Sequence, residues 1–290
     1  MKWLGQLALL GVRQQNRVRY RLKSRRWKTA DCEIAYLLSR PRGARSTLVF
    51  LHGLGASKDQ WGPHIYSLAD AYNCVFIDLP GEGESSYDRT QSYSPFVQVE
   101  RLKAFLETQC FTDIVLIGSS IGGCIACLYA ATYPTGVSRL IALAPAGLAA
   151  MRPSPAMSRF VREGKHPFGY RTVSEMQAFW DIVFTSAPEV PTFLAKALAI
   201  KGAFRYPRVG KILGDFEDAG LYLLQSRLAE VQAMTLIVWG SNDRVFDISC
   251  VDEVNRLLPQ ASICIIRGAG HVPYLEYGEQ TLAAIRQFIL

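Results

Sequence analysis

An α/β fold, with a mostly parallel sheet covered by helices on both faces, is predicted by two features of the sequence. Short, continuous apolar runs such as 47–51 and 74–77 are typical of strands buried on both faces. These runs alternate with longer amphipathic segments, as in consecutive strand–helix units. The alternation stops between 146 and 229, which indicates a helical insertion over the carboxyl edge of the sheet, where such folds bind ligands.

The elements follow in order from local signals. The helix after the strand at 47–51 is expected to begin at Ser57, a capping residue, and the helix from 121 is stopped by Pro134. Expected strands lie at 31–38, 47–51, 74–77, 113–117, 137–143, 234–239 and 262–266, and expected helices at 57–72, 95–110, 121–133, 248–258 and 277–290. We therefore predict an N-terminal arm (1–28), a core (29–145 and 230–290) and a helical cap (146–229).

Charge is concentrated at the start of the chain. Residues 1–45 hold 12 Lys and Arg against two Asp and Glu, whereas residues 46–290 are slightly acidic. A nucleic-acid-binding fold would carry its positive charge on a face of the body, so that class is disfavoured and no nucleic-acid partner is expected. Seven cysteines, most of them in or beside apolar segments, indicate buried thiols in a reducing compartment. Cys124 and Cys127 are expected to be packing residues, and no metal site or cofactor is predicted.

The arm combines an apolar run with a basic block. The apolar run, Trp3 to Val12, is shorter than the roughly 20 residues that span a bilayer. The basic block that follows, 13–28, opposes export and so disfavours a signal peptide. We expect an interfacial segment on anionic lipid, in a cytoplasmic protein held peripherally at the membrane surface. The alternative is an N-terminal helix that packs on the body.

The turn between the strand at 113–117 and the helix at 121–133 carries the chemistry. Gly118-x-Ser120-x-Gly122 is the nucleophile-elbow pattern, in which a serine lies at the tip of a tight strand-to-helix turn. The flanking positions must be glycine because neighbouring chain passes close to them. Ser119 does not fit the pattern, because Ile117 stands where its glycine should be. Ser120 is the predicted nucleophile.

A serine hydroxyl needs a base, normally histidine, and the base needs an orienting carboxylate. His271 lies just after the last strand, at the sheet edge expected to hold Ser120, and is the predicted base. The remaining histidines are less well placed: His52 in a turn, His64 in the next helix and His166 in the insertion.

Asp243 follows the strand at 234–239 directly and is the predicted acid. Asp247 is expected to cap the next helix, and Asp78 lies on the far side of the elbow strand. The predicted oxyanion hole consists of two N–H groups, those of Ile121 and Leu54.

Five motifs together resemble the α/β-hydrolase family over residues 31–290. They are His52-Gly53, the Asp78 to Ser85 turn, the Ser120 elbow, Trp239-Gly240-x-x-Asp243 and Gly270-His271. Residues 58–61, 145–148 and 245–247 resemble the monoacylglycerol lipase branch, typified by a membrane-anchored mammalian serine hydrolase. One departure is Glu82, where many relatives carry histidine.

The resemblance implies a serine hydrolase that cleaves carboxylic esters, monoacylglycerols first, through an acyl-enzyme. The expected partner is a small-molecule lipid ester. Two alternatives on the same fold are a short-chain carboxylesterase and a C–C bond hydrolase of diketone-like substrates. Dehalogenase and epoxide hydrolase chemistry is disfavoured, because those branches carry Asp where Ser120 stands. A non-catalytic binding protein would keep its function when Ser120 is replaced by alanine.

Overall fold

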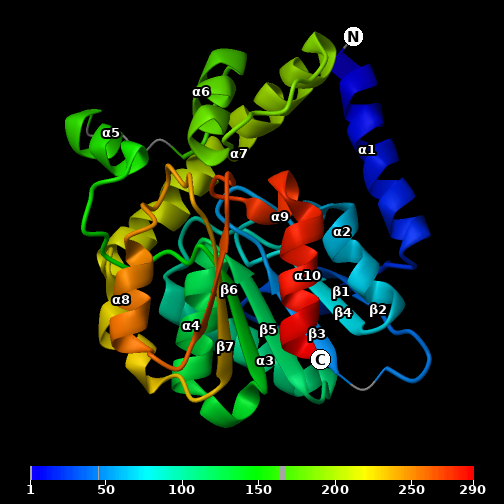
Figure 1. Cartoon of the computed structure of the whole chain (residues 1–290). Helices are drawn as coiled ribbons and strands as arrows, with labels where there is room; N and C mark the ends of the chain where they lie inside the picture. Colours follow the sequence, from blue (N-terminus) through cyan, green and yellow to red (C-terminus); the bar gives the residue numbers. More distant parts are fainter. Residues whose placement is uncertain (1, 45, 164–167) are drawn as a thin grey trace.

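The computed structural model describes residues 2–44, 46–163 and 168–290. Within these ranges, eight strands form one sheet in the order β1-β2-β4-β3-β5-β6-β7-β8 (Figure 1). They are β1 (Lys23–Lys28), β2 (Glu33–Ser39), β3 (Thr47–Leu51), β4 (Asn73–Ile77), β5 (Ile114–Ser119), β6 (Arg139–Leu143), β7 (Met234–Gly240) and β8 (Ser262–Ile266). β2 pairs antiparallel with β1 and β4, whereas β4, β3 and β5 to β8 are parallel. The predicted fold class is confirmed.

Helices cover both faces of the sheet, which explains why the central strands are apolar throughout. They are α2 (Gly62–Tyr66), α3 (Pro95–Gln109), α4 (Ile121–Thr132), α8 (Cys250–Leu257), α9 (Pro273–Glu276) and α10 (Gly278–Ile289). Successive residues of β3 point to opposite faces, so Val49 joins the cluster under α3, α4 and α8 while Phe50 joins the one under α2 and α10. Each face therefore contributes its own hydrophobic core.

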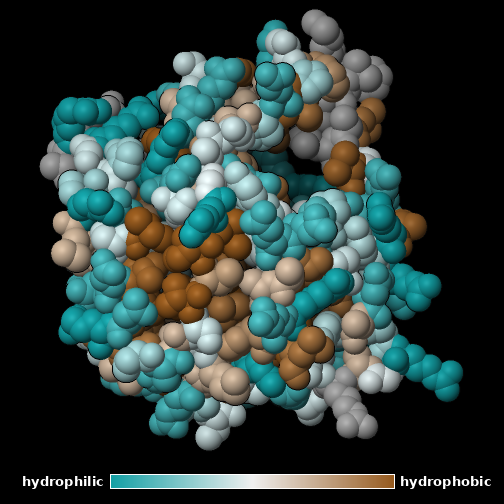
Figure 2. All heavy atoms as spheres, viewed as in Figure 1, coloured by the Kyte–Doolittle hydropathy of each residue, from teal (hydrophilic) through white to brown (hydrophobic). Residues whose placement is uncertain are grey.

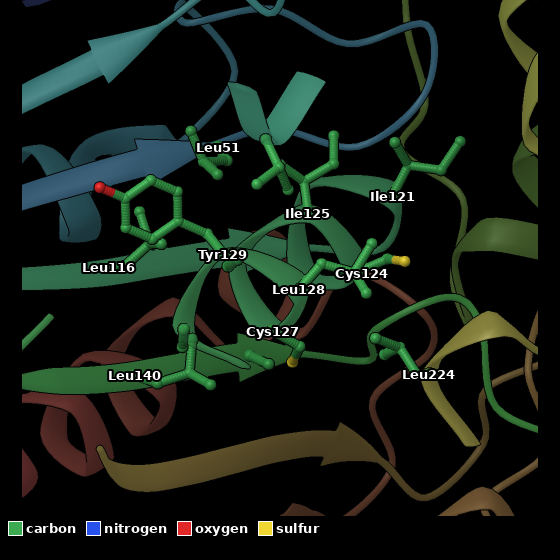
Figure 3. Packing of buried hydrophobic residues seen from close by; sticks show 14 of the residues in the cluster. Leu51, Leu116, Ile121, Cys124, Ile125, Cys127, Leu128, Tyr129, Leu140 and Leu224 are labelled. Atoms are coloured by element: carbon green, nitrogen blue, oxygen red, sulfur yellow. The ribbon is translucent and has the colours of Figure 1, made fainter. Parts of the chain in front are cut away.

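The helix after the elbow, α4, is the centre of one of these cores. Figure 3 shows its side chains, Cys124 and Cys127 among them, packed between the sheet and neighbouring elements. Both cysteines are fully buried and free, and burial raises the pKa of each thiol, so they are packing residues. Cys110, in contrast, is exposed at the end of α3 in a left-handed conformation with φ of 52°, and not in the core.

Three helices form the layer above the carboxyl edge of the sheet: α5 (Pro155–Glu163), α6 (Val173–Val183) and α7 (Thr192–Ala219). The N-terminal helix α1 (Lys2–Arg19) runs beside the body and packs against α7 (Figure 1). Among the described residues, no helix is both long and apolar enough to cross a membrane.

Two local predictions differ from the structure. The helix expected from Ser57 begins at Gly62, with Pro63 in its first turn, because residues 52–61 form loops and turns instead. Residues 23–28, expected as part of an arm, form the edge strand β1, paired with β2. Their side chains are mostly exposed and basic, so no alternation of apolar residues marks the strand in the sequence.

Candidate active site

Ser120 lies at a strained turn between β5 and α4. Its backbone has φ of 56° and ψ of −119°, outside the ordinary regions for a residue with a side chain. A Cβ atom at Gly118 would clash with the carbonyl of Gly122, and one at Gly122 would clash with the carbonyl oxygen of Leu51. The first turn of α4 thus requires glycine at 118, and the close approach of β3 requires glycine at 122. Ser120 is half-buried, whereas Ser119 is fully buried and cannot be reached.

His271 and Asp243 are joined by a short hydrogen bond. The distance between His271 Nδ1 and Asp243 Oδ2 is 2.9 Å, and both side chains are buried. Asp243 Oδ1 accepts the backbone N–H groups of Val245 at 2.8 Å and Phe246 at 3.0 Å, which fixes the carboxylate. Because a carboxylate accepts hydrogen bonds, Nδ1 carries the proton and Nε2 is left as the basic nitrogen.

The backbone around His271 is fixed from the cap. The N–H of His271 donates to the carbonyl oxygen of Val183, at the end of α6, at 2.8 Å. The ring of Phe246 meets the imidazole edge to face, with 5.2 Å between ring centroids. The imidazole is thus packed against Phe246, while the backbone of His271 is tied to the end of α6.

The three residues share one edge of the sheet, since Ser120 follows β5, Asp243 follows β7 and His271 follows β8. Among the described residues, Ser120 Oγ makes no hydrogen bond to His271. Catalytic hydrogen bonds are often long without substrate and shorten in the substrate complex. The structure thus brings Asp243 and His271 into contact and places Ser120 at the same edge.

The loop after β3 passes directly beside Ser120. A Cβ atom at Gly53 would lie 3.2 Å from Ser120 Cβ and 3.8 Å from Ser120 Oγ. Leu54 follows in this loop, and Ile121 opens α4 on the other side of the serine. The first N–H groups of a helix have no partner within the helix, so the N–H of Ile121 is available at this point.

The other histidines have different surroundings. His52 is fully buried, and burial lowers its pKa. Its Nε2 accepts the N–H of Leu79 at 3.1 Å, and its Nδ1 lies 2.8 Å from the carbonyl oxygen of Gly53, so it braces two loops. His64 is exposed on α2. His166 lies outside the described residues.

The other carboxylates also have structural partners. Asp78 is fully buried and accepts from Lys58 Nζ at 2.6 Å. Burial acts to raise the pKa of Asp78, but the surrounding charges and hydrogen bonds, those of Lys58 first, together hold it below its ordinary value. Asp247 was expected to cap α8, but the N-cap is Ser249, and Asp247 accepts the N–H of Ser249 at 2.9 Å in the turn before the helix. Neither carboxylate contacts His271. Among the described residues, no group of three or more His, Cys, Asp and Glu side chains is placed to hold a metal ion.

Glu82 is a buried group beside this site whose contacts the sequence does not indicate. Its side chain is 6% exposed and contacts the loop that carries Leu54. The only signal in the sequence was the departure itself, a carboxylate in a turn where relatives carry histidine.

Comparison with known proteins agrees with this architecture. A model of the alpha/beta hydrolase fold family matches residues 46–277. Lipase 1 of Psychrobacter immobilis is 26% identical over 252 residues, covering 84% of this chain and 77% of the lipase. Human monoacylglycerol lipase ABHD6 is 24% identical over 280 residues, covering 89% and 80%.

A solved structure is similar over nearly the whole length. The crystal structure of a membrane phospholipase A, described as a bacterial virulence factor, has a TM-score of 0.92 and 31% identity. The match covers 99% of this chain and 92% of that one. With the family match spanning most of the chain, the fold and the elbow geometry lead to one conclusion. This chain belongs to the α/β-hydrolase fold family.

Proposed function

We propose that the chain is a serine hydrolase that cleaves carboxylic esters of lipids through an acyl-enzyme. Ser120 is the nucleophile, His271 the general base and Asp243 the residue that orients the base. The observation that carries the proposal is the buried 2.9 Å contact between His271 and Asp243, at the sheet edge where Ser120 lies in a strained turn.

The proposed reaction has two halves. His271 Nε2 takes the proton of Ser120 as Oγ attacks the ester carbonyl, and the N–H groups of Leu54 and Ile121 stabilise the oxyanion. His271 then protonates the leaving alcohol, which departs and leaves the acyl group on Ser120. Water, deprotonated by His271, attacks the acyl-enzyme, and the fatty acid leaves as Ser120 regains its proton.

An apolar cavity beside the site supports an acyl substrate. It has a volume of about 10 Å³ and adjoins Ile121, with Ile212 and Phe216 of α7 on one wall and Ile125 of α4 on another. This volume matches about one water molecule, so a fatty acyl chain needs α7 to move away from α4. Most of the lining is aliphatic or aromatic, with Glu82 and Gln98 as its polar members, so it suits a hydrocarbon chain better than a sugar or a nucleotide.

Monoacylglycerols are the first proposed substrate, on the strength of the relatives that carry that activity in their names. Phospholipids are the second candidate, favoured by the similarity to a membrane phospholipase A along 99% of this chain. A 2-hydroxy-6-oxo-6-phenylhexa-2,4-dienoate hydrolase of a Rhodococcus strain has a similar structure, but at 17% identity this similarity concerns the fold alone.

The experiment is a rate measurement on glycerol monoesters of C4 to C18 and on a diacyl phospholipid, with the wild type and Ser120→Ala. Hydrolysis of C8 or longer monoesters that requires Ser120 is the expected result. A rate confined to C4 would favour the short-chain carboxylesterase, and faster phospholipid cleavage would favour the phospholipase. No hydrolysis dependent on Ser120 on any ester would overturn the proposal.

We also propose that α1 contacts lipid. Arg17 binds both carboxylate oxygens of Asp59, and Arg13 lies 3.7 Å from it, so these two arginines of α1 are directed at the body. Leu7 and Leu10 are more than half exposed. In Figure 2, a few separate hydrophobic side chains are visible in the region where Figure 1 places α1. These side chains are available to enter a membrane surface.

Co-sedimentation with anionic vesicles at low salt tests this contact. The wild type should pellet, and Leu10→Asp should pellet less because a charge replaces an apolar side chain at the lipid interface. Met234→Asp is the matched control, since Met234 is 61% exposed at the amino end of β7, away from α1. A wild type that stays in the supernatant would overturn the proposed contact.

A further inference from the structure

The loop that carries Leu54 is held by a buried carboxyl group. Glu82 lies in the turn after β4, and its side chain is 6% exposed. Its Oε1 accepts the backbone N–H of Gly55 at 2.5 Å. Gly55 has φ of 71° and no side chain, so only contacts made to its N–H and carbonyl groups set the orientation of its peptide groups. Glu82 therefore fixes the residue next to Leu54.

The carbonyl of the same glycine faces the cap. Arg205 of α7 is half-buried, and its Nη1 lies 3.5 Å from the carbonyl oxygen of Gly55. Gly55 is thus contacted by the body through its N–H and by the cap through its carbonyl. The adjacent cavity is lined by Gly55, Ala56, Gly81, Glu82, Gly83, Arg205, Arg208 and Val209, so cap and loop meet over Glu82.

The other end of the loop is held by His52. Its Nδ1–H points at the carbonyl oxygen of Gly53 at 2.8 Å, and Glu82 Oε2 lies 3.5 Å from the same nitrogen. Leu54 therefore lies between two glycines, and each is braced by a buried polar side chain. Small rotations of the Gly53–Leu54 peptide are suppressed, and that peptide carries the N–H proposed for the oxyanion.

We propose that Glu82 is a positioning residue that holds the Leu54 N–H in the oxyanion hole, and that Arg205 shares this role from the cap. This inference rests on the proposed function. Oxyanion donors act in the transition state, and removing one typically lowers kcat by about 10²- to 10³-fold. A donor that is displaced but not removed should therefore lower kcat by a smaller factor. The cap then takes part in catalysis, because the hole is complete only when α7 packs on the loop.

The charge of Glu82 depends on the groups around it. Burial raises the pKa of Glu82 to about 8, against the opposing effects of the Gly55 N–H and the Arg205 charge, while Asp78 raises it further. His52 is neutral, because burial lowers its pKa. Glu82 is therefore largely protonated at pH 7, and glutamine, whose amide oxygen also accepts a hydrogen bond, reproduces its contact with Gly55.

The test compares Glu82→Ala with Glu82→Gln on a soluble p-nitrophenyl ester. Alanine should lower kcat about 10- to 100-fold with KM within about threefold, and glutamine should restore most of the rate at pH 7. Binding of a boronic acid that mimics the tetrahedral intermediate should weaken in the alanine variant by a similar factor. A purely structural role would lower the melting temperature and leave kcat of the folded fraction unchanged.

The cap contribution has its own matched pair. Arg205→Met removes the contact with Gly55 and keeps most of the aliphatic stem, so kcat should fall with KM nearly constant. Arg208→Met is the control, because Arg208 lies one turn away on α7 and stacks over Tyr87, at 4.9 Å from the ring centroid. Should the alanine variant of Glu82 fail to fold, this pair tests whether a contact with Gly55 is needed to hold the Leu54 N–H in place.

The outcomes separate the two proposals. Wild-type hydrolysis that requires Ser120, combined with unchanged kcat in the folded Glu82→Ala and Arg205→Met variants, would overturn the positioning role alone. Equal loss in Arg205→Met and Arg208→Met would also overturn it. An absence of hydrolysis dependent on Ser120 in the wild type would overturn the proposed function and this inference with it.

Discussion

Replacing Asp243 by asparagine tests the tautomer of His271 without removing an atom from the core. Asp243 Oδ1 accepts the N–H groups of Val245 and Phe246, and the oxygen of an asparagine can keep both bonds. The amide nitrogen then occupies the position of Oδ2, 2.9 Å from His271 Nδ1. A nitrogen donor there requires Nδ1 to accept, so the imidazole proton moves to Nε2 and the base is lost.

The expected loss is large and confined to the chemical step. In a Ser-His-Asp triad the wrong tautomer lowers kcat by about 10⁴-fold, which corresponds to about 5.5 kcal/mol of transition-state free energy. KM should change little. The free energy of unfolding should fall by no more than about 1 to 2 kcal/mol, because two of the three hydrogen bonds of Asp243 are kept.

Steady-state hydrolysis of a p-nitrophenyl ester gives kcat and KM, and thermal unfolding gives the stability. Asp247→Asn is the matched control, since Asp247 is another carboxylate after β7 whose contacts are with the start of α8 and with Arg152. It should keep the wild-type kcat. An Asp243→Asn variant within tenfold of the wild type, or a greater loss in the control, would refute the assignment of the acid.

Three further predictions concern stability. Gly122→Ala should leave little folded protein, because its Cβ would clash with the carbonyl oxygen of Leu51. Gly214 lies in α7 with open space around it, so Gly214→Ala should be stabilised by about 0.5 to 1 kcal/mol in thermal unfolding. Burial raises the pKa of Glu82 from 4.5 to about 8, so above pH 4.5 the folded chain holds a proton that the unfolded chain has released. Wild-type stability should therefore fall by up to about 1.4 kcal/mol per pH unit between those values relative to Glu82→Gln, and parallel unfolding curves for the two proteins across pH 5 to 8 would contradict the raised pKa.

The elements that position the chemistry could be predicted from local patterns. Buried parallel strands are apolar throughout, and the glycines around Ser120 are required by close backbone contacts, with α4 at Gly118 and with β3 at Gly122. The strand–turn–helix unit is therefore visible in the sequence. The positions of Asp243 and His271 follow from the same rule, because each comes directly after such a strand. The hydrogen bond between them agrees with the pairing that the motif order implies.

The surroundings of the loop at 53–55 could not be predicted in the same way. Glu82 and Arg205 are separated from Gly55 by 27 and 150 residues, and their contacts arise from how a turn after β4 and a cap helix pack on that loop. No local periodicity encodes the packing of α7. The edge strand β1 could not be predicted for a related reason, since its exposed basic side chains lack the alternation of a half-buried strand.

The most direct test of the account is the site of covalent modification by an alkyl fluorophosphonate, a reagent that phosphonylates activated serines. Peptide mass mapping after reaction with one molar equivalent of reagent should locate one adduct on Ser120. Esterase activity should disappear in proportion to that adduct, and Ser120→Ala should stay unlabelled and inactive. An adduct on a different residue, or ester hydrolysis that persists in Ser120→Ala, would contradict the claim that Ser120 is the nucleophile.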